Sequence, residues 1–415
     1  MSLLQLAETA APTTLISGPE VWMESDATLQ LAAVARLDGC VRAVGMPDLH
    51  PGRGYPVGAV VATHGVVHPQ LVGGDAGCGA RLAITTVAKV DADRLERRLR
   101  DAFGDDLLAD ADPAKVFAAA WHGGARGLAT VDGIPNGLRL LAEREPDHDA
   151  RDAALPASGD PDRFPGGFAR ALGTIGGGNH FAEVSRVTAI HDAAAANTVG
   201  LERHALIAVV HSGSRGLGTA LGAAWGSRPL RDLELATYLG ELAGACRFAR
   251  ANRLVLVYRL LSALAALREH TLRGGFDVTH NDVRAEPVAG ADAWIHRRGA
   301  APAHADNLTI VLGSRGAPSW IMRGTGEEAG LRSVAHGAGR RMTRSDALAK
   351  LKAKYRRSEV ARAPLGGRVL CEDKALLFEE HPDAYKAIEP VVAALEDHHL
   401  ATRVAALAPV VTVKL

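Results

Sequence analysis

Short apolar runs bounded by turn-forming residues recur along the chain. Runs of this length between glycine-rich turns are typical of buried strands. The clearest runs lie at residues 57–62, 81–85, 205–210 and 308–312. The first two fall in a glycine-rich stretch from residue 41 to residue 87, which therefore predicts short strands joined by tight turns.

Other segments repeat their apolar residues with the 3.6-residue period of a helix. These segments are residues 91–103, 113–120, 137–145, 231–270 and 345–357. The predicted strands and helices do not follow a regular strand–helix–strand alternation, and no repeat of fixed period is visible. The pattern therefore predicts a mixed α/β (α+β) fold.

Two stretches depart from both patterns. Residues 143–167 are rich in Asp, Pro and Gly, which predicts an exposed loop. The first 22 residues carry no basic segment, and Gln5, Glu8 and Pro12 interrupt their apolar run, so we expect no signal peptide. No stretch reaches the roughly 20 apolar residues that a membrane span needs.

Composition adds two constraints. The chain has 415 residues, with 47 basic and 47 acidic side chains, so any surface that binds phosphate must be local rather than global. The length allows two or three domains, or one large α/β unit. The four cysteines, which are scattered without a paired framework, favour a reducing cytoplasm. A thiol here is therefore expected to be buried or bound to metal.

Four segments place a side chain that can bind metal beside glycine or directly after an apolar run. Together they offer five donors: Asp75, Cys78, His180, His211 and His280. One thiolate mixed with imidazoles and a carboxylate suits Zn, Mn, Fe or Co better than Ca or Mg. Five donors exceed the four of a closed tetrahedral site, so either two metals share them or one site is open. Both arrangements favour a catalytic centre over a structural one.

Each of these residues also has an ordinary structural interpretation. A lone cysteine such as Cys78 is usually a small buried hydrophobe, and a glycine-rich turn often marks only a tight loop. His50 lies two residues after Asp48 in a glycine- and proline-rich turn, where it could support a ligand or substrate. The coincidence of four such segments favours the functional interpretation, in which these residues form a catalytic metal site.

A fifth segment, SVAHGAGRRMTR at residues 333–344, sets His336 among glycines and before three arginines. Glycines let a ligand approach the main chain closely, and arginines bind phosphate in a bidentate fork. His336 is therefore a candidate nucleophile toward phosphorus. Phosphate contacts and an ordinary solvated face are equally good interpretations of the arginines at 340, 341 and 344.

These motifs together resemble the RtcB-type RNA-splicing ligases. The resemblance runs in order through nearly the whole chain. Its motifs are Met46–His50 with Gly54–Gly58, Asp75-x-x-Cys78-Gly, Gly173–Glu183, His211–Gly216, His280-Asn281, His296–Ala300, Gly313-Ser314-x-Gly316, His336–Arg340, Ala384–Lys386 and Lys414. It implies one catalytic domain over residues 1–415, with a β-rich core surrounded by helices.

The resemblance also implies roles for the residues. Asp75, Cys78 and His180 would hold one Mn²⁺, Cys78, His211 and His280 would hold a second, and His336 would accept GMP from GTP through a phosphoramidate. Asn179 and Glu183 would contact the nucleotide phosphates and the guanine base. The rest of the nucleotide pocket would be formed by Gly313, Ser314, His336, Gly337, Ala338, Gly339 and Lys414.

The same resemblance implies the reaction and its setting. Such enzymes join an RNA end with a 2′,3′-cyclic phosphate or 3′-phosphate to a 5′-hydroxyl end, and some work with an archease-like activator. The guanylate passes from histidine to the 3′-phosphate, and the 5′-hydroxyl then displaces GMP. A cytoplasmic enzyme without a membrane anchor is expected.

Departures from the commoner family pattern bear on the preference for RNA ends more than on metal binding. Small residues separate Asp75 from Cys78, Arg298 stands where many members have lysine, and the His50–Arg53 turn has no aromatic residue. They suggest a divergent bacterial branch, the one associated with a release-factor homologue and RNA repair. Two alternatives remain open: a dinuclear-metal phosphodiesterase or cyclic phosphatase, and a non-catalytic RNA-end-binding protein.

Overall fold

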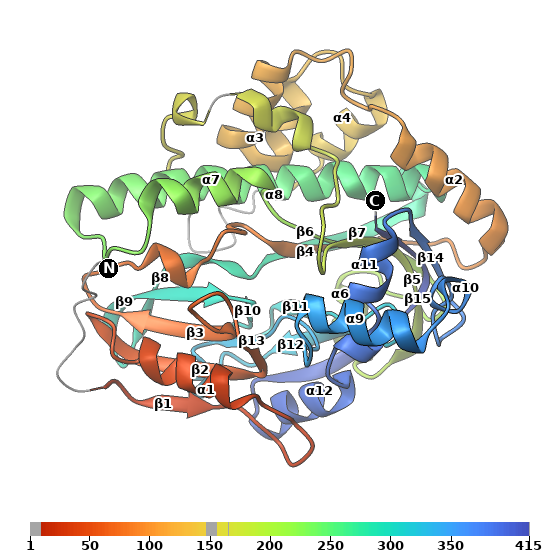
Figure 1. Ribbon diagram of the computed structural model, residues 1–415. Coiled ribbons are helices and arrows are strands. Elements are labelled where there is room, and N and C mark those ends of the chain that lie inside the picture. The colour runs from red at the N-terminus through yellow and green to blue at the C-terminus, as the bar shows by residue number, and fades with distance from the viewer. Residues whose placement is uncertain (1–9, 147–155, 165, 415) are drawn as a thin grey trace.

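The computed structural model describes residues 10–146, 156–164 and 166–414 (Figure 1). Within these ranges the strands form three sheets. The largest has the order β11-β12-β15-β5-β6-β4-β7, and β14 pairs with β15 beside this path. Its strands are β4 (Gly79–Thr85), β5 (Phe181–Ile190), β6 (Leu206–Ser212), β7 (Leu272–Thr279), β11 (Leu308–Val311), β12 (Ser319–Gly324), β14 (Arg368–Cys371) and β15 (Ala401–Lys414).

The second sheet has the order β1-β2-β3-β9-β8, and a strand pair completes the set. The strands of the second sheet are β1 (Thr13–Leu15), β2 (Cys40–His50), β3 (Val57–Thr63), β8 (Asn281–Val288) and β9 (Ala291–Arg298). The pair consists of β10 (Ala300–Pro302) and β13 (Ser333–Ala335). Because β7 and β8 follow each other directly but belong to different sheets, His280 lies at the junction of the two sheets.

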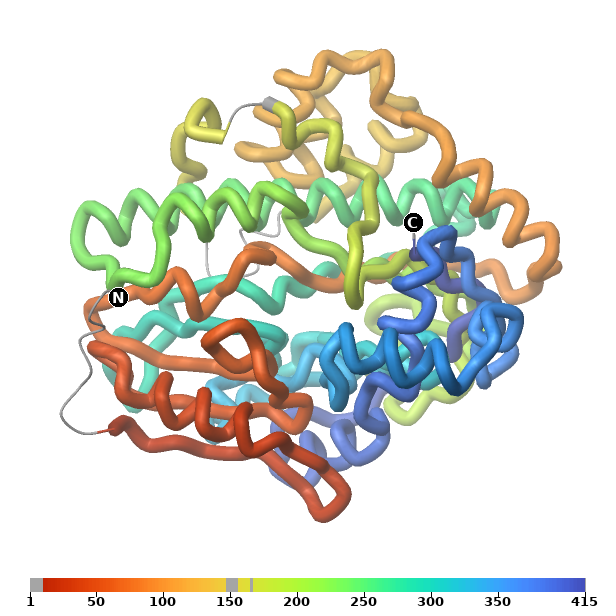
Figure 2. The backbone as a smooth tube through the Cα atoms, in the orientation of Figure 1, coloured from red at the N-terminus to blue at the C-terminus, as the bar shows by residue number. Residues whose placement is uncertain are grey.

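Helices surround these sheets. The helices are α1 (Ser25–Val34), α2 (Ala92–Gly104), α3 (Pro113–Gly127), α4 (Asn136–Glu143), α6 (Ala193–Thr198), α7 (Gly216–Trp225), α8 (Asp232–Ala263), α9 (Arg344–Lys354), α10 (Arg357–Val360), α11 (Lys374–Glu379) and α12 (Ile388–Asp397). The tube in Figure 2 shows α8 running across the molecule, with α2, α3 and α4 on its outer side and strands on its inner side. None of the helices in the described ranges is both long and apolar enough to cross a membrane.

The middle of the large sheet is buried on both faces. Every residue of β4 and of β6 is buried, which explains why the sequence there shows continuous apolar runs rather than alternation. Helix α8 covers one face and is itself covered by α3, so it is buried from Tyr238 onwards on nearly all sides. At Gly244 a Cβ atom would lie 2.3 Å from the ring of Trp121, so only glycine allows the two helices to pack this closely.

The mixed α/β expectation is confirmed, and each predicted strand and helix overlaps an observed one. Boundaries differ most at three helices. The helix expected at 113–120 continues to Gly127. The helix expected at 231–270 ends at Ala263, where Ala265 adopts a positive φ of 57° and the chain turns toward β7. The helix expected at 345–357 is divided into α9 and α10.

The exposed loop expected at residues 143–167 lies partly outside the described residues, at 147–155 and 165. Most of its described residues are exposed or half-buried, whereas Glu145 and Phe164 are buried. The indole of Trp121 donates a 2.6 Å hydrogen bond to the carbonyl of Gly159, and the Ser158 hydroxyl donates to the carbonyl of Trp121. This end of the segment is therefore fixed to α3.

Candidate functional site

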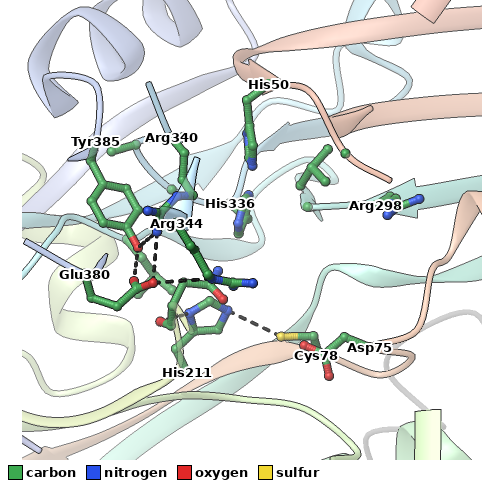
Figure 3. A pocket seen from close by; sticks show the side chains of 18 of the residues that line it. His50, Asp75, Cys78, His211, Arg298, His336, Arg340, Arg344, Glu380 and Tyr385 are labelled. Carbon is green, nitrogen blue, oxygen red and sulfur yellow. Dashed lines mark hydrogen bonds and ion pairs between the residues drawn. The ribbon is translucent and has the colours of Figure 1, made fainter. Parts of the chain in front are cut away.

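A cavity of about 970 Å³ opens where the two large sheets meet. The loop before β4, the end of β6 and the segments that follow β7 and β13 line it, and each of them carries a residue singled out by the sequence. Figure 3 shows His336 between His50 on one side and the pair His211 and Cys78 on the other. The tertiary structure thus brings four of the expected metal donors, Asp75, Cys78, His211 and His280, and the expected nucleophile to one cavity, whereas His180 lies behind its lining.

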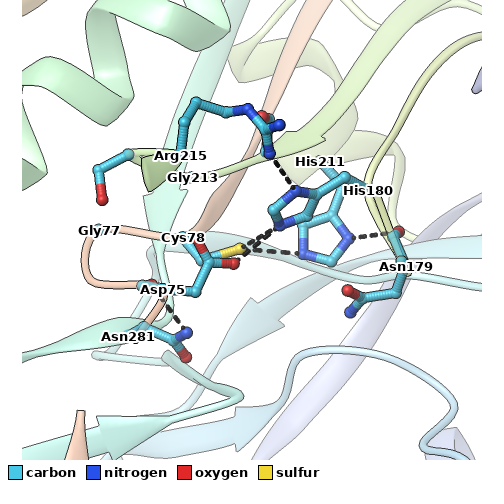
Figure 4. Close-up of polar contacts among 12 residues, drawn as sticks. Asp75, Gly77, Cys78, Asn179, His180, His211, Gly213, Arg215 and Asn281 are labelled. Atoms are coloured by element: carbon cyan, nitrogen blue, oxygen red, sulfur yellow. Dashed lines mark hydrogen bonds and ion pairs between the residues drawn. The ribbon is translucent and has the colours of Figure 1, made fainter. Parts of the chain in front are cut away.

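The five expected metal donors form a continuous cluster, of which Figure 4 shows Asp75, Cys78, His180 and His211. Cys78 Sγ lies 3.3 Å from His180 Nε2 and 3.4 Å from His211 Nε2. His180 Nε2 lies 2.8 Å from Asp75 Oδ2, and His211 Nε2 lies 3.2 Å from His280 Nε2. Cys78 stands in the middle, with Asp75 and His180 on one side and His211 and His280 on the other.

This donor set fits transition-metal ions. Metal–ligand bonds of about 2.0 to 2.3 Å hold tetrahedral ligands about 3.3 to 3.8 Å apart, close to the separations around Cys78. His211 Nδ1 lies 3.2 Å from the backbone carbonyl of Asn179, so this nitrogen donates and leaves the lone pair of Nε2 toward the cluster. This lone pair faces a sulfur atom and another imidazole, and it is available to a metal ion.

Burial favours the neutral form of three titratable groups in the cluster. Burial, followed by the nearby Asp75 carboxylate, raises the pKa of the Cys78 thiol well above its usual range. Burial and the neighbouring histidines lower the pKa of His211 and of His280 well below the ordinary value. Neutral imidazoles are ready to bind metal, whereas the thiol becomes a thiolate only when a metal is present to stabilise it.

His336 lies against this cluster. Its ring centroid is 4.8 Å from that of His280 and 6.1 Å from that of His211. Its Nδ1 lies 2.7 Å from Oδ2 of Asp48, which has no solvent exposure. The carboxylate fixes the tautomer in which Nδ1 carries the proton, so the lone pair of Nε2 remains for a ligand in the cavity.

The backbone around Asp48 is held on two sides. The ammonium group of Lys386 donates to the carbonyls of Pro47 and Leu49. Gly339, with a positive φ of 74°, passes so close that a Cβ atom would lie 2.3 Å from the carbonyl oxygen of Asp48. Glycine at 339 therefore serves close packing of the His336 loop on β2 as well as access for a ligand.

Helix α8 supports the metal loops from behind. The Arg253 guanidinium is fully buried, and it binds both carboxylate oxygens of Asp277 at 2.6 and 2.9 Å. It also donates to the carbonyls of Gly77 and Ser212, the residues next to Cys78 and His211. Gly77, with a φ of 75°, lies against α8, where a Cβ atom would be 2.9 Å from Cys246 Cα. One side chain thus ties three ligand-bearing segments to the helix.

Two asparagines complete this support. Asn252, buried on α8, accepts from the backbone N–H of Gly173 and donates to the carbonyls of Thr174 and Gly213. Asn281 donates to the Asp75 carbonyl at 3.0 Å and accepts from the N–H of Gly299 at 2.7 Å. These bonds position the loops that carry His180, His211 and Asp75.

Most of the residues expected in a nucleotide pocket line the cavity. They are Asn179, Gly313, Ser314, His336, Gly337, Ala338, Gly339 and Lys414. Lys414, at the end of β15, donates to the carbonyls of Gly178 and His180. Burial lowers the pKa of its ammonium group to about 8, against the opposing effect of the Glu380 carboxylate.

Glu183 differs from this group. It lies on β5, is buried, and is not among the residues that line the cavity. Its carboxylate accepts from the hydroxyl groups of Ser185 at 2.6 Å and Thr412 at 2.5 Å. Burial raises its pKa to about 7. Its expected contact with guanine requires the nucleotide to reach it past Thr412, which does line the cavity.

The three arginines after His336 have different surroundings. Arg340 donates to a carboxylate oxygen of Glu380 at 2.9 Å and lies over the ring of Tyr385, so it is part of a fixed network. The Arg344 guanidinium packs against Gly178 and lines the cavity, with its side chain about half exposed. Arg341 is exposed and lines a separate pocket. Arg344 is the best placed of the three for a mobile phosphate.

A strained residue stands beside the cluster. Arg215 has φ 61° and ψ −142°, a region that residues other than glycine rarely occupy. Its guanidinium lies over Gly176 and 3.4 Å from His180 Nδ1 (Figure 4). Such strain, which costs on the order of 1 to 3 kcal/mol, is typical of functional loops.

Sequence reasoning missed the supporting residues. It noted Asp48 only as a neighbour of His50, and it assigned no role to Arg253, Asn252 or Glu380. Asp48 was recognisable because it lies within the Met46–His50 motif, whereas Arg253 sits in a helix whose pattern gives no sign of its partners. Buried charges on an otherwise apolar helix were the one available signal.

The chain is similar to known proteins over most of its length. The family model described as tRNA-splicing ligase RtcB matches residues 30–229 and 226–415. The RNA-splicing ligase RtcB2 of Escherichia coli is 37% identical over 407 residues, which cover 96% of this chain and 94% of that protein. The RNA-splicing ligase RtcB of Mycobacterium tuberculosis is 32% identical, covering 93% of this chain and 100% of the relative. The tRNA-splicing ligase RtcB of Methanococcus maripaludis is 28% identical, with coverage of 94% and 92%.

Proposed function

The chain belongs to the RtcB family of RNA-splicing ligases, and we propose that it joins RNA ends through a guanylate carried on His336. The RNA substrates are a strand ending in a 3′-phosphate or 2′,3′-cyclic phosphate and a strand beginning with a 5′-hydroxyl. GTP supplies the guanylate. The observation that carries the proposal is the position of His336. Its ring centroid lies 4.8 Å from that of His280 in the expected metal cluster, and its Nδ1 is hydrogen-bonded to buried Asp48.

In the first step the lone pair of His336 Nε2 attacks the α-phosphorus of GTP. A nitrogen–phosphorus bond forms, the bond to the bridging oxygen breaks, and pyrophosphate leaves. Asp48 keeps its hydrogen bond to Nδ1–H throughout and stabilises the positive charge that develops on the ring. Backbone groups of Gly337 and Gly339 let the nucleotide approach closely.

The two later steps return the enzyme to its starting state. An oxygen of the RNA 3′-phosphate attacks the phosphorus on His336, so the guanylate moves to the RNA end. The 5′-hydroxyl of the second strand then attacks the 3′-phosphate phosphorus and GMP leaves. A 2′,3′-cyclic phosphate must first be opened by water to the 3′-phosphate. Arg298, Arg344 and Lys414 line the cavity and offer positive charge to these phosphates.

The metal requirement follows from the donor set. Asp75, Cys78 and His180 would hold one ion, and Cys78, His211 and His280 a second, with Cys78 shared; we propose Mn²⁺ for both. Such ions supply neutralisation of phosphate charge and stabilisation of the transition state. Arg253 and Asn281 hold the loops of these ligands in place.

The decisive experiment is incubation of purified protein with α-labelled GTP and Mn²⁺, followed by denaturing electrophoresis. We expect label on the wild type and none on His336→Ala. The rate of labelling of Asp48→Asn should be about 10²- to 10⁴-fold lower, because asparagine cannot hold His336 in the reactive tautomer. Asp306→Asn, at an exposed position, is the matched control and should behave like the wild type.

The same experiment tests the alternatives. A dinuclear-metal phosphodiesterase would hydrolyse a cyclic phosphate without carrying label, and an RNA-end-binding protein would show neither activity. Absence of label on a wild type with full metal content would therefore overturn the ligase mechanism. We further propose that the enzyme acts in the cytoplasm and that an archease-like protein activates it; its placement in the branch linked to a release-factor homologue stays a prediction.

A further inference from the structure

A second pocket, of about 580 Å³, lies beside the first. It is lined by the segment before α1, by the residues that follow the His336 loop, and by the facing sides of α9 and α12. Trp22 is the large aromatic side chain at this pocket, and it is 50% exposed. Met342, Pro390 and Val391 give the pocket an apolar floor. The nucleotide chemistry described above uses none of these side chains.

Positive charge predominates around this pocket. Arg341, Lys350 and Lys386 line it, against one carboxylate, that of Glu20. Lys386 is buried and occupied by the carbonyls of Pro47 and Leu49. Arg341 donates to the carbonyl of Asp383, and neither it nor Lys350 forms an ion pair within the described ranges. Two exposed cations therefore remain for an anionic ligand.

The pocket continues the main cavity. Met342 lines both, and the segment that contributes Trp22 to the second pocket contributes Glu24 and Asp26 to the first. Met342 is six positions after His336, a span of at most about 22 Å even for an extended chain. An RNA strand whose end lies at His336 needs only a few nucleotides to reach Trp22.

We propose that this second pocket binds a nucleotide of an RNA strand that enters the main cavity, with a base stacked on Trp22 and its backbone phosphate held by Arg341 and Lys350. This inference rests on the proposed function for the presence of RNA in the main cavity. An exposed aromatic ring flanked by cations is the arrangement by which proteins hold single-stranded nucleic acid without reading its sequence. An apolar peptide would use the ring and the floor but would gain nothing from the two cations.

The test is equilibrium binding of fluorescently labelled single-stranded RNA of ten nucleotides, without GTP, to the Mn²⁺-loaded protein. One RNA carries phosphate at both ends and represents the 3′-phosphate strand; the other carries hydroxyl groups at both ends and represents the 5′-hydroxyl strand. We expect Trp22→Ala to weaken binding of one of them about five- to one-hundred-fold, as stacking on an aromatic side chain predicts. Trp22→Phe should retain most of the affinity. The RNA that responds identifies the strand.

Lys350→Ala tests the phosphate contact. It should weaken binding of the same RNA and reduce the slope of log affinity against log salt concentration by about 0.7, the value for one phosphate contact on a single strand. Lys352→Ala, on α9 but outside the pocket, is the matched control and should leave both quantities unchanged. Metal content and unfolding temperature, measured on every variant, show that the fold is intact.

Unchanged affinity for both RNAs in folded Trp22→Ala and Lys350→Ala would overturn the proposal and leave the pocket to a protein partner or to no ligand. An equal effect of Lys352→Ala would also overturn it, because the cations would then act through overall charge alone. Labelling of the wild type with GTP needs no RNA, so loss of the proposed function would be recognised separately by the absence of a GMP adduct.

Discussion

Asp48 and Glu183 are both buried carboxylates near the site, yet their partners give them different properties. Asp48 accepts from an imidazole N–H, which orients His336. Among the residues that the structure describes, the side-chain partners of Glu183 are two hydroxyl groups, those of Ser185 and Thr412. Neutral hydroxyl groups stabilise a carboxylate less than a charge would, so burial prevails and the pKa of Glu183 rises to about 7.

This pKa predicts how stability depends on pH. Because the pKa of Glu183 is higher in the folded protein, the folded protein holds a proton that the unfolded chain has already lost. The resulting stabilisation is complete below the ordinary glutamate pKa and is lost as pH rises through about 7. Relative to Glu183→Gln, the wild type should lose on the order of 3 kcal/mol of unfolding free energy between pH 4.5 and 8.

Urea unfolding at a series of pH values measures this difference. Glutamine can keep both hydroxyl contacts because a hydroxyl group both donates and accepts. Glu269→Gln, whose side chain is 85% exposed, is the control and should show no comparable trend. A constant difference between wild type and Glu183→Gln across the pH range would show that Glu183 does not titrate as described.

At the scale of elements, α8 positions the expected metal donors although it contributes none of them. Its Arg253 joins Asp277 on β7 to the carbonyls beside Cys78 and His211. Its Asn252 fixes the loop before His180. The helix was expected from its periodicity, but its role was not, because a helical period carries no information about the partners of a buried arginine.

Arg253→Lys should therefore weaken metal binding. Lysine keeps the charge but cannot bind the Asp277 carboxylate in bidentate fashion while it reaches two carbonyl groups. Loss of such outer contacts lowers metal affinity by about 10- to 100-fold. Calorimetric titration of Mn²⁺ into metal-free protein measures the effect.

Arg259→Lys provides the matched comparison on the same helix. Arg259 donates to the carbonyls of Ala102 and Asp105, which lie away from the cavity. The Arg259→Lys variant should therefore bind Mn²⁺ like the wild type. An equal loss in both variants would mean that the arginines stabilise α8 in general, and wild-type affinity in Arg253→Lys would remove its positioning role.

At the scale of the whole molecule, the site combines distant parts of the chain. Strands β4, β5 and β6 precede residue 229, whereas β7, β11, β12 and β15 follow it, and all belong to one sheet. The metal donors are divided in the same way, with His280 and the supporting Arg253 in the second part. This interleaving favours the single domain expected over residues 1–415, which stays a prediction.

A single domain should unfold in one cooperative transition. Calorimetry, far-ultraviolet circular dichroism and tryptophan fluorescence should give coincident curves, and Mn²⁺ should raise the midpoint of all three together. A fragment of residues 1–229 should not bind Mn²⁺ with native affinity. Two separate transitions, only one of them shifted by Mn²⁺, would show independent domains.

The fold class, the strands at the middle of the sheet, the candidate metal donors and the candidate nucleophile His336 could all be predicted from the sequence. These features are recognisable because burial imposes a local pattern. Every residue of β4 and β6 is buried, so both strands are largely apolar, and the candidate site residues lie among glycines just before β4 and at the end of β6.

Only the tertiary structure decided which atoms meet. Asp48 and His336 are 288 residues apart, and Lys386 reaches the carbonyl of Leu49 across 337 residues. Hydrogen bonds between such distant residues leave no periodic trace in the chain, because each depends on how sheets and helices pack rather than on neighbours in sequence. The orientation of the nucleophile, the support from α8 and the second pocket at Trp22 all arise in this way.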